Sequence, residues 1–282
     1  MTIQKKVFDF FLFSSLFIAV VAVVMVYHTY TLLIQQPTNP FFLAFVFFST
    51  VSSYNFHWLL TPHSVNPSFR LSWSYNHKGY HLFLFISGSC LAIYLFFYLI
   101  NDWFWIGIAA LLTFLYSAPK ISLAPFQWLK RFAIGKTIFL AMVWTYVTSV
   151  LPLIVENVSW SEKSILFCVG EFFFIYSICI LFDYRDRQDD IADGIRSMIT
   201  YFNEKGITIL FIVSVLTSTT LFFLLTRLGI PWLNFILLLI PLLIVSMLFN
   251  HTKKSFSDYL FYFVLDGLMM LSGLLLWIMN RF

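Results

Sequence analysis

Apolar runs of about 20 residues recur along the chain, and they constrain its fold more than any other feature. A helix needs roughly 20 residues to cross about 30 Å of hydrocarbon, and lipid leaves open backbone groups without partners, so each run must be helical. With 60% hydrophobic and 11% charged residues, the chain favours an all-α, polytopic membrane protein, a single transmembrane domain over residues 1–282. Nine runs are predicted to span: 7–34, 40–60, 80–100, 103–119, 132–155, 164–182, 206–226, 230–249 and 258–279.

Lysine and arginine fall mainly on one side of this predicted arrangement. Only three of the 17 lie on the other side, and these are Lys163, Arg227 and Arg281. Because cytoplasmic loops carry the excess of Lys and Arg, we predict an integral membrane protein with a cytoplasmic N-terminus and an external C-terminus. We interpret the pI near 8.9 as topology and contact with membrane lipids, with no nucleic-acid partner.

Carboxylates are concentrated at the end of the sixth run, in the stretch LFDYRDRQDDIADG that begins at Leu181. If the helix continues, each residue advances by about 100°, so Asp183, Asp186, Asp190 and Asp193 share one face. Like charges at this spacing repel one another. Mg²⁺ binds carboxylate oxygens and often shares its shell with substrate phosphates, so the pattern is typical of a magnesium site. The alternative is a solvated helix end whose aspartates are neutralised by nearby arginines.

Two motifs resemble those of the UbiA-type membrane prenyltransferases. The first is DxxDxxxDxxxG across Asp183, Asp186 and Asp190, which is similar to the second aspartate motif of that family, at the cytoplasmic end of the sixth of nine helices. The second lies in FLYSAPKISLAPFQWLKR, where Tyr116 and Lys120 fit a YxxxK motif. The basic pair Lys130-Arg131 follows it, and GKTIFLAMVWTYVTSVLP resembles the fifth helix of bacterial members, which suggests a bacterial cell membrane.

The resemblance implies Mg²⁺-dependent transfer of a prenyl group from a prenyl diphosphate to a lipophilic acceptor. Metal ions and basic residues would stabilise the leaving pyrophosphate. The roles implied are metal binding by Asp183, Asp186 and Asp190, diphosphate contacts by Lys120, Lys130 and Arg131, and a catalytic place for Tyr116 beside Lys120.

The chain departs from the family pattern at the end of the second run, where NDxxD is expected. Asn55 fits the leading asparagine of a substrate-binding motif, but Phe56 and Leu59 occupy the aspartate positions. This change removes both charge and metal-ligand oxygens. His57 and His63 lie nearby, although imidazole is a poor ligand for Mg²⁺.

Two further carboxylates, Glu171 and Asp266, fall inside predicted spans, where acids mark a site or a polar pairing. Glu171 lies about 18 Å along the helix from Asp183, too deep for the metal site. The alternative function is a catalytically degenerate relative that binds a lipid phosphate or supports a partner membrane protein. A transporter is the third alternative, less favoured because the helix-breaking prolines lie near the ends of the runs.

Overall fold

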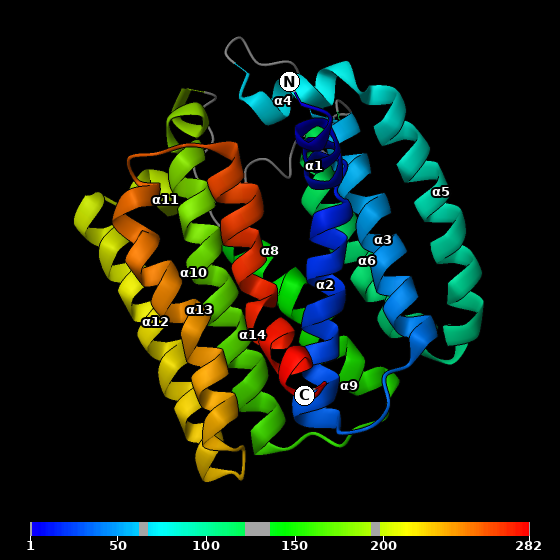
Figure 1. The fold of residues 1–282 in the computed structure, drawn as a ribbon, viewed down its shortest axis with the longest axis vertical. Coiled ribbons are helices and arrows are strands. Elements are labelled where there is room, and N and C mark those ends of the chain that lie inside the picture. Colours follow the sequence, from blue (N-terminus) through cyan, green and yellow to red (C-terminus); the bar gives the residue numbers. More distant parts are fainter. Residues whose placement is uncertain (1, 62–66, 122–135, 193–197, 282) are drawn as a thin grey trace.

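The computed structural model describes residues 2–61, 67–121, 136–192 and 198–281, and within these ranges the chain is helical without a strand (Figure 1). The α-helices are α1 (Ile3–Phe13), α2 (Leu16–Thr29), α3 (Pro40–Leu59), α4 (Phe69–Asn76), α5 (Lys78–Phe96), α6 (Trp103–Ser117), α8 (Lys136–Thr145), α9 (Leu151–Val155), α10 (Glu162–Ala192), α11 (Met198–Tyr201), α12 (Glu204–Arg227), α13 (Trp232–Thr252) and α14 (Asp266–Met279). Three π-helical segments are η1 (Tyr30–Ile34), η5 (Tyr146–Val150) and η6 (Leu260–Leu265), and two 3₁₀ segments are η2 (Phe97–Asp102) and η3 (Ala118–Lys120).

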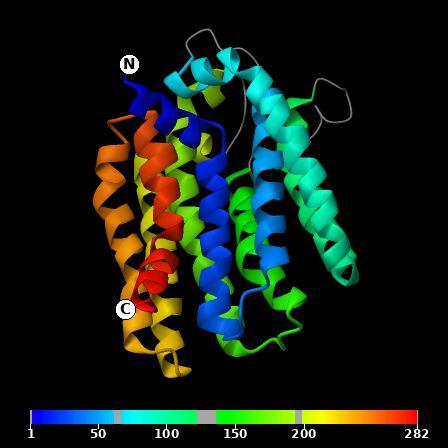
Figure 2. The same cartoon turned by 45° about the vertical axis from the view of Figure 1, so that its right-hand side comes forward.

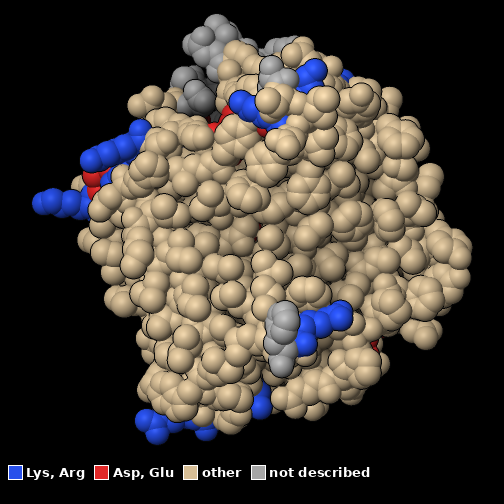
Figure 3. All heavy atoms as spheres, viewed as in Figure 1, with Lys and Arg blue, Asp and Glu red and all other residues tan. Residues whose placement is uncertain are grey.

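Seven helical segments of the described chain are long and apolar enough to cross a membrane. They are Leu16–Ile34, Lys78–Lys120, Lys136–Val155, Glu162–Gln188, Glu204–Arg227, Trp232–Thr252 and Leu260–Met279. The predicted count of nine is not confirmed by this criterion, because the third and fourth predicted spans fall in one segment and α3 is not among the seven. On the face shown in Figure 3, charged side chains gather toward the two ends of the molecule, and the band between them is uncharged.

The 43-residue segment Lys78–Lys120 doubles back on itself at η2. At its beginning, His81 Nδ1 lies 2.6 Å from Asn55 Oδ1 near the end of α3, and in η2 the Tyr98 ring stacks at 4.4 Å on Phe41 at the start of α3. Lys120 then returns to the end of α3. Helix α5 therefore runs antiparallel to α3, and α6 runs back toward the end where α5 began.

Small residues let α5 approach α3 closely. A methyl group added at Gly88 would lie 3.0 Å from the carbonyl oxygen of Phe48 and 3.1 Å from the Ser52 backbone nitrogen. At the next residue of α5, the hydroxyl of Ser89 lies 2.7 Å from that of Ser52. Small side chains and interhelical hydroxyl bonds are the usual means of packing helices in lipid, where no hydrophobic force pushes them together.

The predicted first span, 7–34, is wrong as one continuous helix. It breaks at Ser14 and Ser15, and Ser15 adopts a left-handed backbone with φ of 69°. Helix α1 consequently turns away from α2 and lies across one end of the bundle (Figure 2). The break frees the Ser14 carbonyl, which accepts a hydrogen bond from the buried Asn55 amide at 3.0 Å.

Helix α10 lies inside the bundle against α8, α12 and α13, and it carries the sixth predicted span. It approaches α12 closely at Gly170, where an added methyl group would lie 2.5 Å from the Phe222 ring of α12. The Ser218 hydroxyl of α12 also donates to the Gly170 carbonyl at 2.9 Å. The prediction that this helix continues past 182 is confirmed, because α10 extends to Ala192 and holds Asp183, Asp186 and Asp190 on one helix.

Candidate functional site

The Tyr116–Lys120 motif meets the end of α3 through His57. The Lys120 ammonium donates to His57 Nε2 at 2.6 Å and to the Thr61 hydroxyl at 2.7 Å. His57 Nδ1 lies 3.1 Å from the Ser117 hydroxyl, and the Tyr116 ring stacks on the imidazole at 5.3 Å. Within the described ranges, no ion pair involves Lys120, so its two hydrogen-bond partners here are neutral groups.

The carboxylates of α10 have cationic and hydroxyl partners. Asp183 is 6% exposed and accepts a hydrogen bond from the Thr137 hydroxyl at the start of α8. Asp186 is more open, with a side chain 40% exposed, and pairs with Arg185 at 2.8 Å. Asp190 is buried one turn further along. The negative charge at this end of α10 is therefore offset by Arg185 of the same helix, and α8 contributes a hydrogen bond from Thr137.

Lys136 joins the two motifs. This first residue of α8 lies within electrostatic range of Asp183, Tyr116, Asp190 and Asp186. It also acts on Lys120, which in turn lies within range of Asp186. The structure thus brings the YxxxK motif and the aspartate motif to one end of the bundle, with Lys136 between them. Sequence reasoning used Lys136 only as a topology charge, although its place at the head of GKTIFL could have identified it.

Side chains at the end of α3 pack against neighbouring segments in this structure. Asn55 is fully buried, and its amide donates to the Ser14 carbonyl at 3.0 Å and to the Val51 carbonyl at 2.7 Å, while its oxygen faces His81. The Phe56 ring packs 5.2 Å from Phe85. A direct role for Asn55 in binding substrate stays a prediction, since its amide here ties α3 to the α1–α2 break.

Two arginines lie beside the motifs in an aromatic setting that the sequence analysis did not anticipate. Arg70 of α4 is 3% exposed and lies 4.1 Å from the Trp58 ring and 4.3 Å from the Tyr262 ring. Arg185 donates to the Tyr262 hydroxyl at 3.1 Å. Asp258 accepts from the Arg70 backbone N–H at 2.8 Å. Burial lowers the pKa of the Arg70 guanidinium, and the Tyr262, Asp266 and Asp258 side chains oppose that shift.

Several predicted residues do not bear on this geometry. Lys130, Arg131 and His63 lie outside the described residues. Glu171 is buried in α10 at 4% exposure, deeper in the bundle than the aspartates. Asp266 lies within electrostatic range of Arg70 and Arg185, so it belongs to the arginine side of the site.

A divalent ion is not caged by protein groups alone in this arrangement. Within the described residues, no three His, Cys, Asp or Glu side chains are grouped closely enough to hold a metal. Mg²⁺ commonly binds through one or two carboxylates together with substrate phosphates and water. Asp183 and Asp186 are carboxylates of the required type, so the donor set fits a magnesium ion that arrives with a diphosphate.

Comparisons with known proteins add no assignment: no family model, no curated protein and no solved structure matches the chain.

Proposed function

We propose that the chain binds a prenyl diphosphate at this end of the bundle and, with Mg²⁺, transfers its prenyl group to a lipophilic acceptor within the membrane. The observation that carries the proposal is the meeting of Lys120, Lys136 and the α10 aspartates around His57 and Tyr116. Cations beside carboxylates are what a metal-bound diphosphate requires, and the two motifs together supply them.

Lys120 is the group best prepared for an anion. Its ammonium is bonded to the His57 imidazole and the Thr61 hydroxyl, which are neutral acceptors, and no described carboxylate pairs with it. A phosphate oxygen would give it a charge-assisted hydrogen bond that these partners do not provide. Lys130 and Arg131 are proposed as further diphosphate contacts on the grounds of their motif alone.

Asp183, Asp186 and Asp190 are proposed to hold the magnesium. When bound, the ion would neutralise the charge that develops on the leaving pyrophosphate. The chain's own contribution would be to orient the diphosphate with Lys120 and to exclude water with the aromatic side chains at the end of α3.

A second function is favoured by the end of α3. With Phe56 and Leu59 in place of aspartates, half of the usual metal cradle is apolar, and Lys136 already offsets the charge of the α10 aspartates. This arrangement supports a protein that binds the phosphate of an isoprenoid lipid without transferring its prenyl group. In this second function a divalent ion is not required.

The topology we propose has nine spans. Helix α3 has 20 residues, enough for one crossing, and the doubling back at η2 divides Lys78–Lys120 into two crossings. Added to the other six apolar segments, these give nine. The excess of Lys and Arg at the end that holds α4 and Lys120 favours a cytoplasmic site, a cytoplasmic N-terminus and an external C-terminus. Cysteines introduced at Lys78 and Lys205 should react with a membrane-impermeant reagent only from the cytoplasmic side, and one at Asn157 only from outside.

Binding of prenyl diphosphates by the wild-type protein in nanodiscs would distinguish the two proposed functions. Prenyl diphosphates from geranyl to long polyprenyl chains would be titrated with Mg²⁺ and with EDTA, and pyrophosphate release would be followed in the presence of membrane-lipid extract. The matched prenyl alcohol serves as control. Mg²⁺-dependent binding with pyrophosphate release supports transfer. Binding without Mg²⁺ and without release supports the second function, and no binding at any chain length rejects both.

A further inference from the structure

Helix α1 buries its one carboxylate and exposes a stripe of apolar residues. Asp9 is fully buried, whereas Ile3 is 81% exposed and Val7 is 63% exposed, and Phe10 and Phe11 complete the exposed stripe. One oxygen of the buried Asp9 carboxylate accepts a 2.6 Å hydrogen bond from the Tyr259 hydroxyl. An apolar stripe that faces away from the protein needs a partner of its own.

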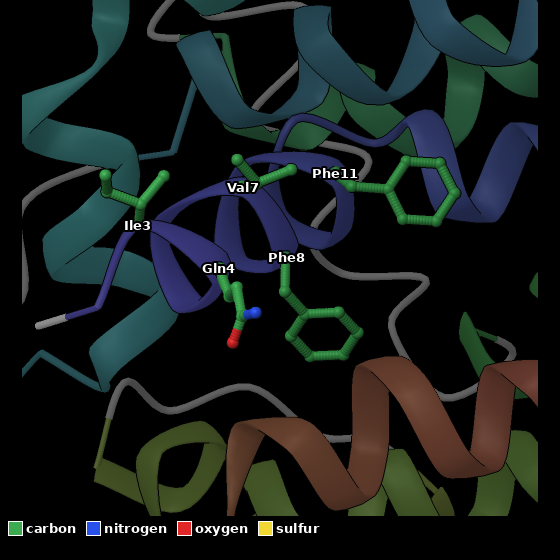
Figure 4. Close-up of a pocket in the computed structure, with 5 residues that line it drawn as sticks. All are labelled: Ile3, Gln4, Val7, Phe8 and Phe11. Carbon is green, nitrogen blue, oxygen red and sulfur yellow. The ribbon is translucent and has the colours of Figure 1, made fainter.

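The stripe borders a hollow of about 440 Å³ that is almost wholly apolar (Figure 4). Its lining comes from one helix: Ile3, Gln4, Val7, Phe8 and Phe11. Aromatic contacts join it to the flank of the bundle, because the Phe11 ring lies 5.9 Å from Phe17 of α2 and the Phe8 ring lies 5.2 Å from Phe263 of η6. Phe263 is 42% exposed and belongs to an apolar segment long enough to span a membrane. The hollow is therefore continuous with a surface that would face acyl chains.

A second hollow of about 320 Å³ lies next to the first and is more polar. Lys5, Ser68 and Ser257 contribute to its lining together with Asp258 and Tyr259. The Phe8 and Tyr259 rings stack at 6.0 Å between the two hollows. One Asp258 oxygen accepts from the Arg70 N–H, and Lys6, next to Lys5 in the chain, is exposed as Lys5 is, so this end of α1 presents two exposed cations.

We propose that α1 binds an anionic phospholipid of the leaflet at this end of the bundle, with an acyl chain in the apolar hollow and the headgroup phosphate at Lys5 and Lys6. The occupant follows from the arrangement: an open apolar hollow along α1, aromatic contacts that lead onto a segment able to span a membrane, and a hydroxyl-lined recess that holds Lys5. The inference is independent of the proposed prenyl transfer, because neither hollow is lined by Lys120 or by the α10 aspartates.

The test is retention of phosphatidylglycerol by protein extracted from vesicles of phosphatidylcholine and phosphatidylglycerol, measured by native mass spectrometry. We expect wild-type protein to retain phosphatidylglycerol in preference to phosphatidylcholine. Lys5→Gln with Lys6→Gln should weaken retention by about fivefold for each lysine. The matched control is Lys78→Gln with Lys205→Gln, which removes two exposed lysines from the same end that line neither hollow.

Val7→Gln tests the acyl-chain hollow without changing charge. It should reduce retention of both lipids and should do so equally at high salt, whereas the lysine effect should vanish there as the charges are screened. An unchanged melting temperature in detergent shows that each variant is folded. Equal retention of the two lipids by wild type, or equal loss in the control pair, would overturn the proposal. So would a second copy of the chain bound at α1, detected as a lipid-free dimer that Val7→Gln dissociates.

Discussion

The ends of α3 and α10 lie at the same end of the bundle, but their side chains differ in charge and in what they contact. At the end of α10, the carboxylates of Asp183 and Asp186 have Thr137, Lys136 and Arg185 beside them. At the end of α3, Asn55 and Phe56 carry no charge, and both contact neighbouring segments of the bundle. One end places carboxylates beside cations, and the other holds helices together.

The difference shows that the apolar side chains at the end of α3 have surroundings that suit them. Phe56 has aromatic neighbours on α5 and α6, and its ring lies 6.4 Å from Phe114. Beside it, Lys120 bonds to His57 and the Thr61 hydroxyl. Restoring an acid at this place would therefore require more than a change of side chain.

The largest effect is expected when the α3 end is made acidic. Phe56→Asp with Leu59→Asp should destabilise the protein by about 3 kcal/mol or more, because an aromatic side chain is lost and a carboxylate enters an aromatic setting. Chemical unfolding in detergent measures this, with Phe56→Leu as the control for lost size. Stable protein that gains Mg²⁺-dependent diphosphate affinity would mean that the two ends are equivalent half-sites.

Loss of the Asn55 amide should cost about 2–3 kcal/mol of stability, because Asn55→Ala leaves the Ser14 carbonyl and His81 without their buried partner. Ser53→Ala, on the same helix, removes only a bond to the Thr50 carbonyl and serves as control. Thermal unfolding and diphosphate titration would be run on both variants. Normal stability with abolished binding would instead assign Asn55 to the ligand.

Lys120→Ala is expected to weaken binding of a prenyl diphosphate by about 1.5–3 kcal/mol, the usual worth of a hydrogen bond to a charged group. Stability should change little, since no described ion pair is broken. Calorimetric titration measures the affinity, and Lys163→Ala at the opposite end is the matched charge control. Unchanged affinity in folded protein would make this lysine a topology signal alone.

The smallest change in stability is expected at the α10 end. Asp186→Asn removes a half-exposed ion pair with Arg185, which is worth about 0.5 kcal/mol or less. Divalent dependence of ligand binding should nevertheless disappear, because a metal ligand is lost. Asp102→Asn, outside the site, controls for charge. Binding that stays dependent on Mg²⁺ would exclude Asp186 as a ligand.

The sequence located most helices because long apolar runs leave few alternatives in lipid. The prediction 40–60 matches α3, and the continuation of the sixth run into the aspartates matches α10. The break at Ser15 escaped prediction because neither glycine nor proline marks it. It is stabilised by Asn55, which lies 40 residues further along the chain.

The sequence predicted those parts of the candidate site that lie in contiguous motifs. It did not predict the parts that packing brings together from distant segments. Tyr116 and Lys120, four residues apart, could be read from a pattern, as could the α10 aspartates. Arg70 could not, because its aromatic neighbours come from α3 and η6, and Tyr262 is almost 200 residues away. His57 was noticed as a poor metal ligand, but its bond to Lys120 depends on α6 returning beside α3.

The Lys120–His57 bond makes the imidazole an internal reporter of the site. An ammonium has only donors, so His57 Nε2 must accept, and the ring proton must sit on Nδ1 and point to Ser117. A ligand that draws Lys120 away removes the donor at Nε2, and this tautomer loses its preference. The nitrogen chemical shifts of a single labelled histidine would then register occupancy of the site, without any need to know the acceptor or the chain length.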